Sequence, residues 1–282
     1  LVVVIIAFFM PNYDTYSQMS QVPALKPRFT RANTFATSIY GDIGERMLTH
    51  SATSAIHTLN AYVNMTRRQL PNLQNNFASV LTNGTIEGSP TPGSIHFMKN
   101  NTINESLARI VLMADKELGI KANITPGDVR IFQDLSTGFD KFGVEMNLTM
   151  EIDSGIANWN HTGRISIMLP VENFDDPYYL MNNRSKIRVN FSNLTNSTVQ
   201  QVWTHIDNSR YVYEKDAPSF LMRFDNSSAN SSCCGIESLI NPNRLGITSN
   251  VQRSYVDYCF YTDPNRNSCG HDPPYDFVLH NF

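Results

Sequence analysis

Thirteen Asn-X-Ser/Thr sequons constrain the fold of this 282-residue chain more than any other feature of its sequence. An N-linked glycan is bulky and projects into solvent, so each element that carries a sequon must leave that side open. The sequons are about three times as frequent as random placement of Asn, Ser and Thr would make them. They begin at Asn64, Asn83, Asn100, Asn104, Asn123, Asn147, Asn160, Asn183, Asn190, Asn193, Asn196, Asn226 and Asn230.

This excess of sequons predicts an extracellular or cell-surface glycoprotein, because N-glycosylation takes place outside the cytosol. We expect N-linked glycans and no other cofactor. The alternative is an Asn- and Thr-rich chain whose sequons stay unused.

The composition argues against several functional classes. Charged residues make up 17% of the chain and its net charge is −3, whereas nucleic-acid binding requires a clustered basic surface. Hydrophobic residues make up 41% and aromatic residues 11%, which a disordered chain would not contain. At this length the chain can bury a sizeable core in one large domain or two small ones.

All four cysteines lie in the last 50 residues, at Cys233, Cys234, Cys259 and Cys269. Adjacent cysteines rarely bridge each other, since the ring that they close is strained. We therefore predict that Cys233 and Cys234 each pair with one of the two later cysteines. The rival interpretation is a metal site, but the chain contains no Cys-X-X-Cys spacing to support it.

The first ten residues, Leu1–Met10, are entirely apolar. A helix that spans a bilayer needs about 20 such residues, and a signal peptide would add a positive n-region and a small-residue cleavage site. Three interpretations remain: the end of a longer hydrophobic helix, a β-branched strand that inserts into a neighbouring subunit, or a core element. Because the chain starts on Leu, we expect truncation or processing. The residues expected to make assembly contacts are Val4, Ile5, Ile6, Phe8 and Phe9.

Helical periodicity dominates the first part of the chain after an extended connector, Pro11–Thr30. A long helix is predicted over Asn33–Leu70, weakened by Gly41 and Gly44. Its apolar stripe consists of Phe35, Ile39, Ile43, Met47, Ala52, Ala55, Leu59 and Val63.

Two shorter helices are predicted to follow. One covers Leu73–Leu81 and stops at the Asn83-Gly84 pair. The other begins with a capping box, Thr102-X-X-Glu105, and closes at Gly119. Its apolar face consists of Leu107, Ile110, Val111, Ala114 and Leu118.

The periodicity then changes to strict alternation of apolar and polar residues. Val144–Ile152 alternates without a break, Arg164–Leu169 and Lys186–Phe191 nearly do so, and Asp128–Ile131 starts in the same way. Alternation is typical of strands with one buried and one solvated face, so we predict an antiparallel sheet.

The sequons agree with this pattern. Asn147 and Asn190 fall on the polar faces of their predicted strands, and Asn160 is expected in the loop before the strand at Arg164. Glycans would therefore project from the exposed face of the sheet while the helices cover the other. Such a face is a poor active site and a poor subunit interface, so contacts are expected in the sequon-free stretches 1–63 and 231–282.

These elements predict an α+β fold, a long N-terminal helix and shorter helices packed on an antiparallel β-sheet with a disulfide-stapled C-terminal region. The expected parts are a hydrophobic segment and connector (1–32), a helical part (33–125) and a sheet part with the C-terminal disulfides (126–282).

Two acidic clusters invite a chemical interpretation. In the Asp175-Asp176-Pro177 stretch, an Asp followed by Pro favours the N-cap of a short helix over an acid–base pair. Near Cys269, the cluster of His271, Asp272 and Asp276 favours a turn over a calcium or zinc site. The chain contains no nucleophile elbow, phosphate-binding loop or dinucleotide fingerprint, so we expect neither an enzyme nor a metal site.

Four stretches together resemble archaeal surface proteins that are anchored by an N-terminal type IV pilin-like hydrophobic helix. The stretches are Phe174–Asn182, Ala217–Phe224, Cys234–Pro242 and Tyr255–Tyr261. The resemblance implies that Leu1–Met10 is the end of a helix packed in a filament core, with the head outside. The chain departs from the pilin pattern, because it has no prepilin-peptidase recognition segment and its head is large for a major pilin. A minor pilin, a filament-tip protein and a membrane-anchored surface protein are all compatible with the sequence.

The resulting hypothesis is a structural or adhesive subunit of an archaeal extracellular filament or envelope. Its expected partners are copies of itself, other surface subunits and, through the N-terminal segment, the membrane; nucleic acid is not expected. One alternative uses residues 1–10 as a donor strand. Another is an extracellular hydrolase or ligand-binding receptor domain, since a catalytic triad can assemble from scattered residues.

Overall fold

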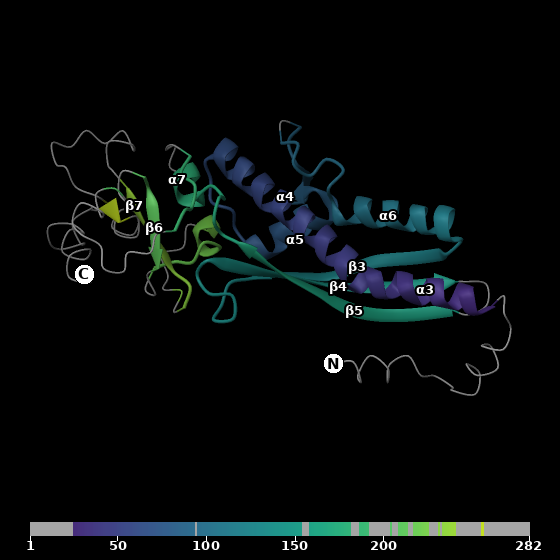
Figure 1. Ribbon diagram of the computed structural model, residues 1–282. Helices are drawn as coiled ribbons and strands as arrows, with labels where there is room; N and C mark the ends of the chain where they lie inside the picture. Colours follow the sequence, from purple (N-terminus) through teal and green to yellow (C-terminus); the bar gives the residue numbers. More distant parts are fainter. Residues whose placement is uncertain are drawn as a thin grey trace.

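The computed structural model describes residues 25–93, 95–153, 158–181, 186–191, 204, 208–213, 217–225, 231, 233–240 and 255–256. Its helices pack on one side of a long antiparallel sheet, and a smaller sheet lies at the far end (Figure 1). The predicted α+β class is confirmed.

The predicted long helix is divided in two, α3 (Leu25–Tyr40) and α4 (Asp42–Thr66). The helix therefore begins inside the expected connector, and it ends before Leu70 because Arg67 adopts the left-handed conformation with φ 56°. The close approach of α4 to the sheet depends on Gly44. A Cβ atom added at Gly44 would lie 2.5 Å from Ile165 Cδ1 and 2.1 Å from the carbonyl oxygen of Ile39. The break at Gly41 turns Ile43, which was expected in the apolar stripe, to 40% exposure.

The two shorter helices carry the predicted caps. In α5 (Leu73–Asn83), Gly84 closes the helix with φ 70°. In α6 (Ile103–Met113), the capping box between Thr102 and Glu105 is present in both directions. A short hairpin joins these helices through β1 (Thr85–Ile86) and β2 (Ser89–Pro90).

A π-helical turn, η1 (Ala114–Leu118), extends α6 before Gly119 ends it with φ 63°. Because a π-turn changes the number of residues per turn, it rotates the following side chains relative to the α-helical stripe. Leu118, which was expected on the apolar face, is consequently 41% exposed.

The large sheet consists of β3 (Lys121–Phe132), β4 (Lys141–Asp153) and β5 (Asn158–Pro170), in the order β3-β4-β5 with antiparallel pairing. Alternation in β4 places one set of side chains against the helices, and the buried set is Phe142, Val144, Met146, Leu148, Met150 and Ile152. All three strands are longer than predicted, and β4 extends beyond the expected Val144–Ile152 at both ends. β3 begins seven residues before the expected Asp128, and β5 already contains Asn160, which was expected in a loop.

The remaining described elements are α7 (Pro177–Met181), β6 (Arg210–Tyr213), the 3-10 helix η2 (Met222–Asp225), β7 (Ile236–Ile240) and β8 (Tyr255–Val256). The second sheet has the order β6-β7-β8. Residues 186–191 were predicted to form a strand but make only isolated bridges. Their backbone pairs with the short loop before α7, through Asp176 N–H to Ile187 and Val189 N–H to Phe174, and that loop is too short to extend the ladder.

Candidate functional site

Eight of the thirteen sequon asparagines lie in the described part of the chain, and none of the eight is buried. The exposed ones are Asn83, Asn100, Asn104, Asn123 and Asn160, and the half-buried ones are Asn64, Asn147 and Asn190. Asn183, Asn193, Asn196, Asn226 and Asn230 lie outside the described residues. The exposure of the described set is what attachment of a glycan requires.

Three of these sequons share the outer side of the large sheet, which we call the sequon face. It carries Asn123 on β3, Asn147 on β4 and Asn160 on β5. Asn123 and Asn160 lie on either side of Glu151 in the strand register. Because the side chains of residues i and i+2 point to the same side of a strand, the three sequon hydroxyls also share this face. Thr125, Thr149 and Thr162 form the next row of the register.

Sequence reasoning found Asn147 on this face but missed its two neighbours. The signal at Asn123 was the short alternation of Ala122 and Ile124, which is interrupted by Pro126-Gly127, where the register shifts in a bulge. At Asn160 the inner positions are Trp159, His161 and Gly163 rather than aliphatic residues, so the alternation was not visible.

Polar contacts on the sequon face run between neighbouring strands. The Asn123 amide donates to the Glu151 carboxylate at 3.4 Å, and the hydroxyls of Thr149 and Thr162 lie 3.0 Å apart. An open depression of about 490 Å³ lies at one end of the large sheet and is lined by residues of both faces, among them Glu151 on the outer side and Ile152 and Trp159 on the inner side. Asn123 and Asn160 are also part of its lining, so a glycan on either residue would start beside this depression.

A second group of sequons surrounds the start of α6. The side-chain amide of Asn104 donates to the side-chain carbonyl of Asn83 at 2.7 Å. Asn100 adopts a left-handed conformation with φ 62°, and its carbonyl accepts from the Arg109 guanidinium at 2.7 Å. Sequons therefore flank both the sheet and the helical layer.

The acidic pair before α7 is structural, as the N-cap interpretation predicted. Asp176 Oδ1 accepts the backbone N–H of Tyr178 at 2.9 Å, which caps the helix. Its Oδ2 accepts from the Tyr211 hydroxyl at 2.6 Å and from Arg223 Nη1 at 2.7 Å. The side chains of Asp176 and Arg223 are both 0% exposed, so this carboxylate is occupied and shielded from any substrate in solvent.

The same ion pair joins distant parts of the chain, and we call it the buried latch. Arg223 belongs to η2, its guanidinium lies 4.8 Å from the ring centroid of Tyr178, and it also donates to the carbonyl of Ile236. Burial of two charges is tolerated only when each is hydrogen-bonded to the other and to its surroundings. The latch therefore fixes α7, β6, η2 and the start of β7 to one another.

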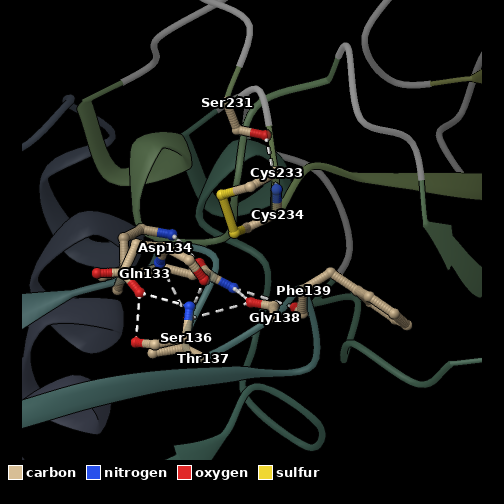
Figure 2. Close-up of a disulfide and its surroundings, with 10 residues drawn as sticks. Gln133, Asp134, Ser136, Thr137, Gly138, Phe139, Ser231, Cys233 and Cys234 are labelled. Atoms are coloured by element: carbon tan, nitrogen blue, oxygen red, sulfur yellow. Dashed lines mark hydrogen bonds between the residues drawn. A yellow bond between two sulfur atoms is a disulfide. The ribbon is translucent and has the colours of Figure 1, made fainter.

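The disulfide differs from the predicted pairing, because Cys233 is bonded to the adjacent Cys234. The eight-membered ring is accommodated in a partly buried position, with Cys234 buried and its N–H donating to Ser231 Oγ at 3.2 Å. Figure 2 shows the β3–β4 loop, residues 133–139, among the surroundings of this bond. That loop is held by Gln133, whose amide donates to the carbonyl of Phe139 at 3.0 Å. Cys259 and Cys269 lie outside the described residues.

Several other predicted residues also lie outside the described part of the chain. They include the assembly residues Val4, Ile5, Ile6, Phe8 and Phe9, and the acidic cluster with His271, Asp272 and Asp276. Among the residues that the structure does describe, no helix combines the length and the apolar character needed to cross a bilayer. The same residues contain no cluster of three or more His, Cys, Asp or Glu arranged to hold a metal ion.

The chain was also compared with known proteins. A scan against protein-family models and searches of curated proteins and of solved structures found no match.

Proposed function

We propose that this chain is a glycosylated structural or adhesive subunit of an extracellular filament or cell envelope, of the archaeal pilin-like kind that its sequence resembles. It assembles through the hydrophobic segment Leu1–Met10 and leaves the head in solvent. The observation that carries the proposal is the sequon face, where sequons from three successive strands share one open surface.

Glycans on the sequon face and around the start of α6 would keep protein partners away from both layers of the head. Contacts with protein partners would then be confined to the two ends of the molecule. The described chain begins with α3 at one end, and β6 and β7 lie at the other (Figure 1). A subunit held by the segment before α3 would therefore present the end with β6 and β7 farthest from the assembly.

Burial of Leu1–Met10 supplies the driving force in this proposal. Apolar surface contributes about 25 cal/mol per Å² buried, and the ordering of the segment and of the subunit offsets part of it. A donor strand formed by the same residues would bury a similar surface, so the helical and the strand alternatives differ in conformation rather than in driving force.

No described feature favours the hydrolase or receptor alternative. The depression at the end of the large sheet is bordered by two sequon asparagines, and Asp176 is enclosed in the buried latch. The proposal accordingly assigns the protein no catalytic residue.

The test combines glycopeptide mass spectrometry with electron microscopy of the native material. We expect glycans on the described sequons and an ordered assembly that is lost in Val4→Asp/Ile5→Asp, while circular dichroism shows a folded head. The matched control, Gln69→Asp/Ser89→Asp, adds two charges at exposed positions and should assemble normally. Native protein without glycans, or unchanged assembly of the Val4/Ile5 variant, would overturn the proposal.

A further inference from the structure

The sequons of the described head differ in how firmly the fold holds them, and this difference carries an inference about when they are modified. Each enzyme that reads Asn-X-Ser/Thr must reach the Asn amide and the hydroxyl two residues later at the same time. The chain between these two groups has to adopt the shape of the enzyme's site. A sequon locked in a regular element cannot do so without breaking that element.

The sequon at Asn147 is the most firmly held of those on the sequon face. It lies in the central strand β4, whose neighbours β3 and β5 pair with it on both sides. A Cβ atom added at Gly127 of β3 would lie only 3.3 Å from the Cβ of Asn147, which shows how closely the neighbouring strand approaches. Its hydroxyl partner Thr149 is engaged with Thr162 at 3.0 Å. Detaching this segment would require the whole sheet to open.

The sequon at Asn100 is blocked in a different way. Asn100 itself is exposed, but Thr102 is only 6% exposed, because it is the N-cap of α6. The Thr102 hydroxyl donates to the Glu105 carboxylate at 2.8 Å and accepts the Glu105 N–H at 3.2 Å. The hydroxyl that an enzyme must read is therefore committed to the capping box.

Two further sequons lie in helices, Asn64–Thr66 at the end of α4 and Asn104–Ser106 in the first turn of α6. Residues i and i+2 of a helix do not face each other, so the amide and the hydroxyl point in different directions. The Thr66 hydroxyl also donates to the Tyr62 carbonyl at 2.9 Å.

The sequon at Asn83 is different from these. Asn83 is exposed, Gly84 is in the left-handed region with φ 70°, and Thr85 opens the two-residue strand β1. The junction is held by the Gly84 N–H to the Val80 carbonyl at 2.9 Å, the Thr91 N–H to the Gly84 carbonyl at 3.1 Å and the Asn104 amide to Asn83 at 2.7 Å. These bonds lie outside the large sheet, so the junction can open locally without loss of the core.

We infer that the glycans at Asn100 and Asn147 are attached before the head folds, whereas Asn83 remains open to modification in the folded head. The inference depends on the proposed glycosylation of this protein. It adds an order of events: the sequons within regular elements are modified first, and the head folds afterwards.

The test uses the full chain made without glycosylation, incubated with a purified oligosaccharyltransferase and its lipid-linked oligosaccharide. One sample is folded, and the other is unfolded in a concentration of urea that the enzyme tolerates. Short peptides that carry each sequon give the intrinsic rate at Asn83, Asn100 and Asn147. Occupancy is read by glycopeptide mass spectrometry, and circular dichroism reports the fold.

In the folded sample we expect Asn83 to react near its peptide rate, and Asn147 and Asn100 to react about 1,000-fold more slowly, because core elements open almost only through global unfolding. Unfolding should restore all three rates. A folded chain modified at Asn147 and Asn100 at their peptide rates would overturn the inference. If the unglycosylated chain cannot fold although the native glycoprotein refolds, that result would also support glycosylation before folding. Absence of glycans from the native protein would refute the proposed function and leave these acceptor rates as a separate result.

Discussion

The ring of Tyr40 lies on Gly163, where an added Cβ atom would come within 2.6 Å of the ring. Tyr40 is the last residue of α3, and its hydroxyl donates to the backbone carbonyls of Leu148 in β4 and His161 in β5, both at 2.9 Å. The ring also packs edge-on against His161, with centroids 4.9 Å apart. One side chain thus fastens the end of α3 to two strands, immediately before the break at Gly41.

Replacement of Gly163 by Ala should displace the Tyr40 ring. We expect a loss of about 1–3 kcal/mol in the free energy of unfolding, the usual cost of overpacking a close contact. Urea unfolding followed by circular dichroism measures it. The control is Gly93→Ala, where nothing lies within 4 Å of the added atom and stability should stay the same or rise slightly. If Gly163→Ala and Gly93→Ala changed the free energy of unfolding equally, the close contact between Tyr40 and Gly163 would be contradicted.

Alkaline pH should weaken the same contact. Burial raises the pKa of Tyr40 to about 12, from 10.0. Since the folded pKa exceeds the unfolded one, the contribution to stability is complete below pH 10 and is lost as pH rises toward 12. The chain contains 12 tyrosines, so the informative measurement is the difference between the wild type and Tyr40→Phe. The variant should lose less stability between these two pH values, and parallel curves would refute the assignment.

Acidic pH should lower the stability of the fold through protonation of His57. Its ring stacks on Phe97 and lies beside Phe174, with centroids 5.5 and 5.0 Å away. Burial lowers the pKa of His57, Asp175 opposes that shift and Arg188 adds to it. The unfolded chain therefore binds the proton more readily, and stability should fall as pH drops below 6.5. His57→Gln should flatten this part of the stability curve, and a curve that stays parallel to that of the wild type would contradict the role of His57.

The buried latch should respond to substitution far more than an exposed pair of the same residue types. Removal of one partner in Asp176→Asn or Arg223→Met leaves a buried charge uncompensated, which costs about 3–5 kcal/mol. The matched control is Arg46→Ala, which breaks an ion pair with Asp42 whose side chains are 79% and 70% exposed. That change should cost about 0.5 kcal/mol or less. In a double-mutant cycle by urea unfolding, the two latch substitutions together should cost less than their sum; strict additivity would show that the two side chains are uncoupled.

The disulfide can be checked by mass spectrometry of proteolytic peptides without reduction. We expect the peptide that contains Cys233 and Cys234 to be two hydrogens lighter than its reduced form and free of any cross-link. A cross-linked species that joins it to a peptide with Cys259 or Cys269 would restore the pairing that the sequence favoured. The reduced and alkylated protein provides the reference masses.

Local signals in the sequence predicted local structure well. The capping box at Thr102, the stop at Gly84 and the N-cap at Asp176 each depend on a few neighbouring residues, and each was confirmed. The alternation in β4 was equally easy to recognise in the sequence, because apolar residues fill its inner face.

The features that sequence reasoning missed depend on distant partners. The start of β5 has Trp159 beside Phe29 and Gly163 beneath Tyr40, so α3 supplies the apolar surface that alternation would otherwise have revealed. The latch joins Asp176 to a residue 47 positions away, which no local pattern encodes. The pairing of Cys233 with Cys234 contradicted a general rule about ring strain, and the sequence contained no signal of the exception.

The end-to-end layout of the head has a mechanical consequence. The strands β3–β5 run along the direction that separates the start of α3 from β6 and β7 (Figure 1). If the N-terminal segment is held and the far end is pulled, the load acts along these strands. The ladder between β4 and β5 extends without a gap from Lys141↔Pro170 to Asp153↔Asn158, so its bonds would share a shearing force instead of peeling apart one after another. This arrangement makes the large sheet resistant to tension along the direction of its strands.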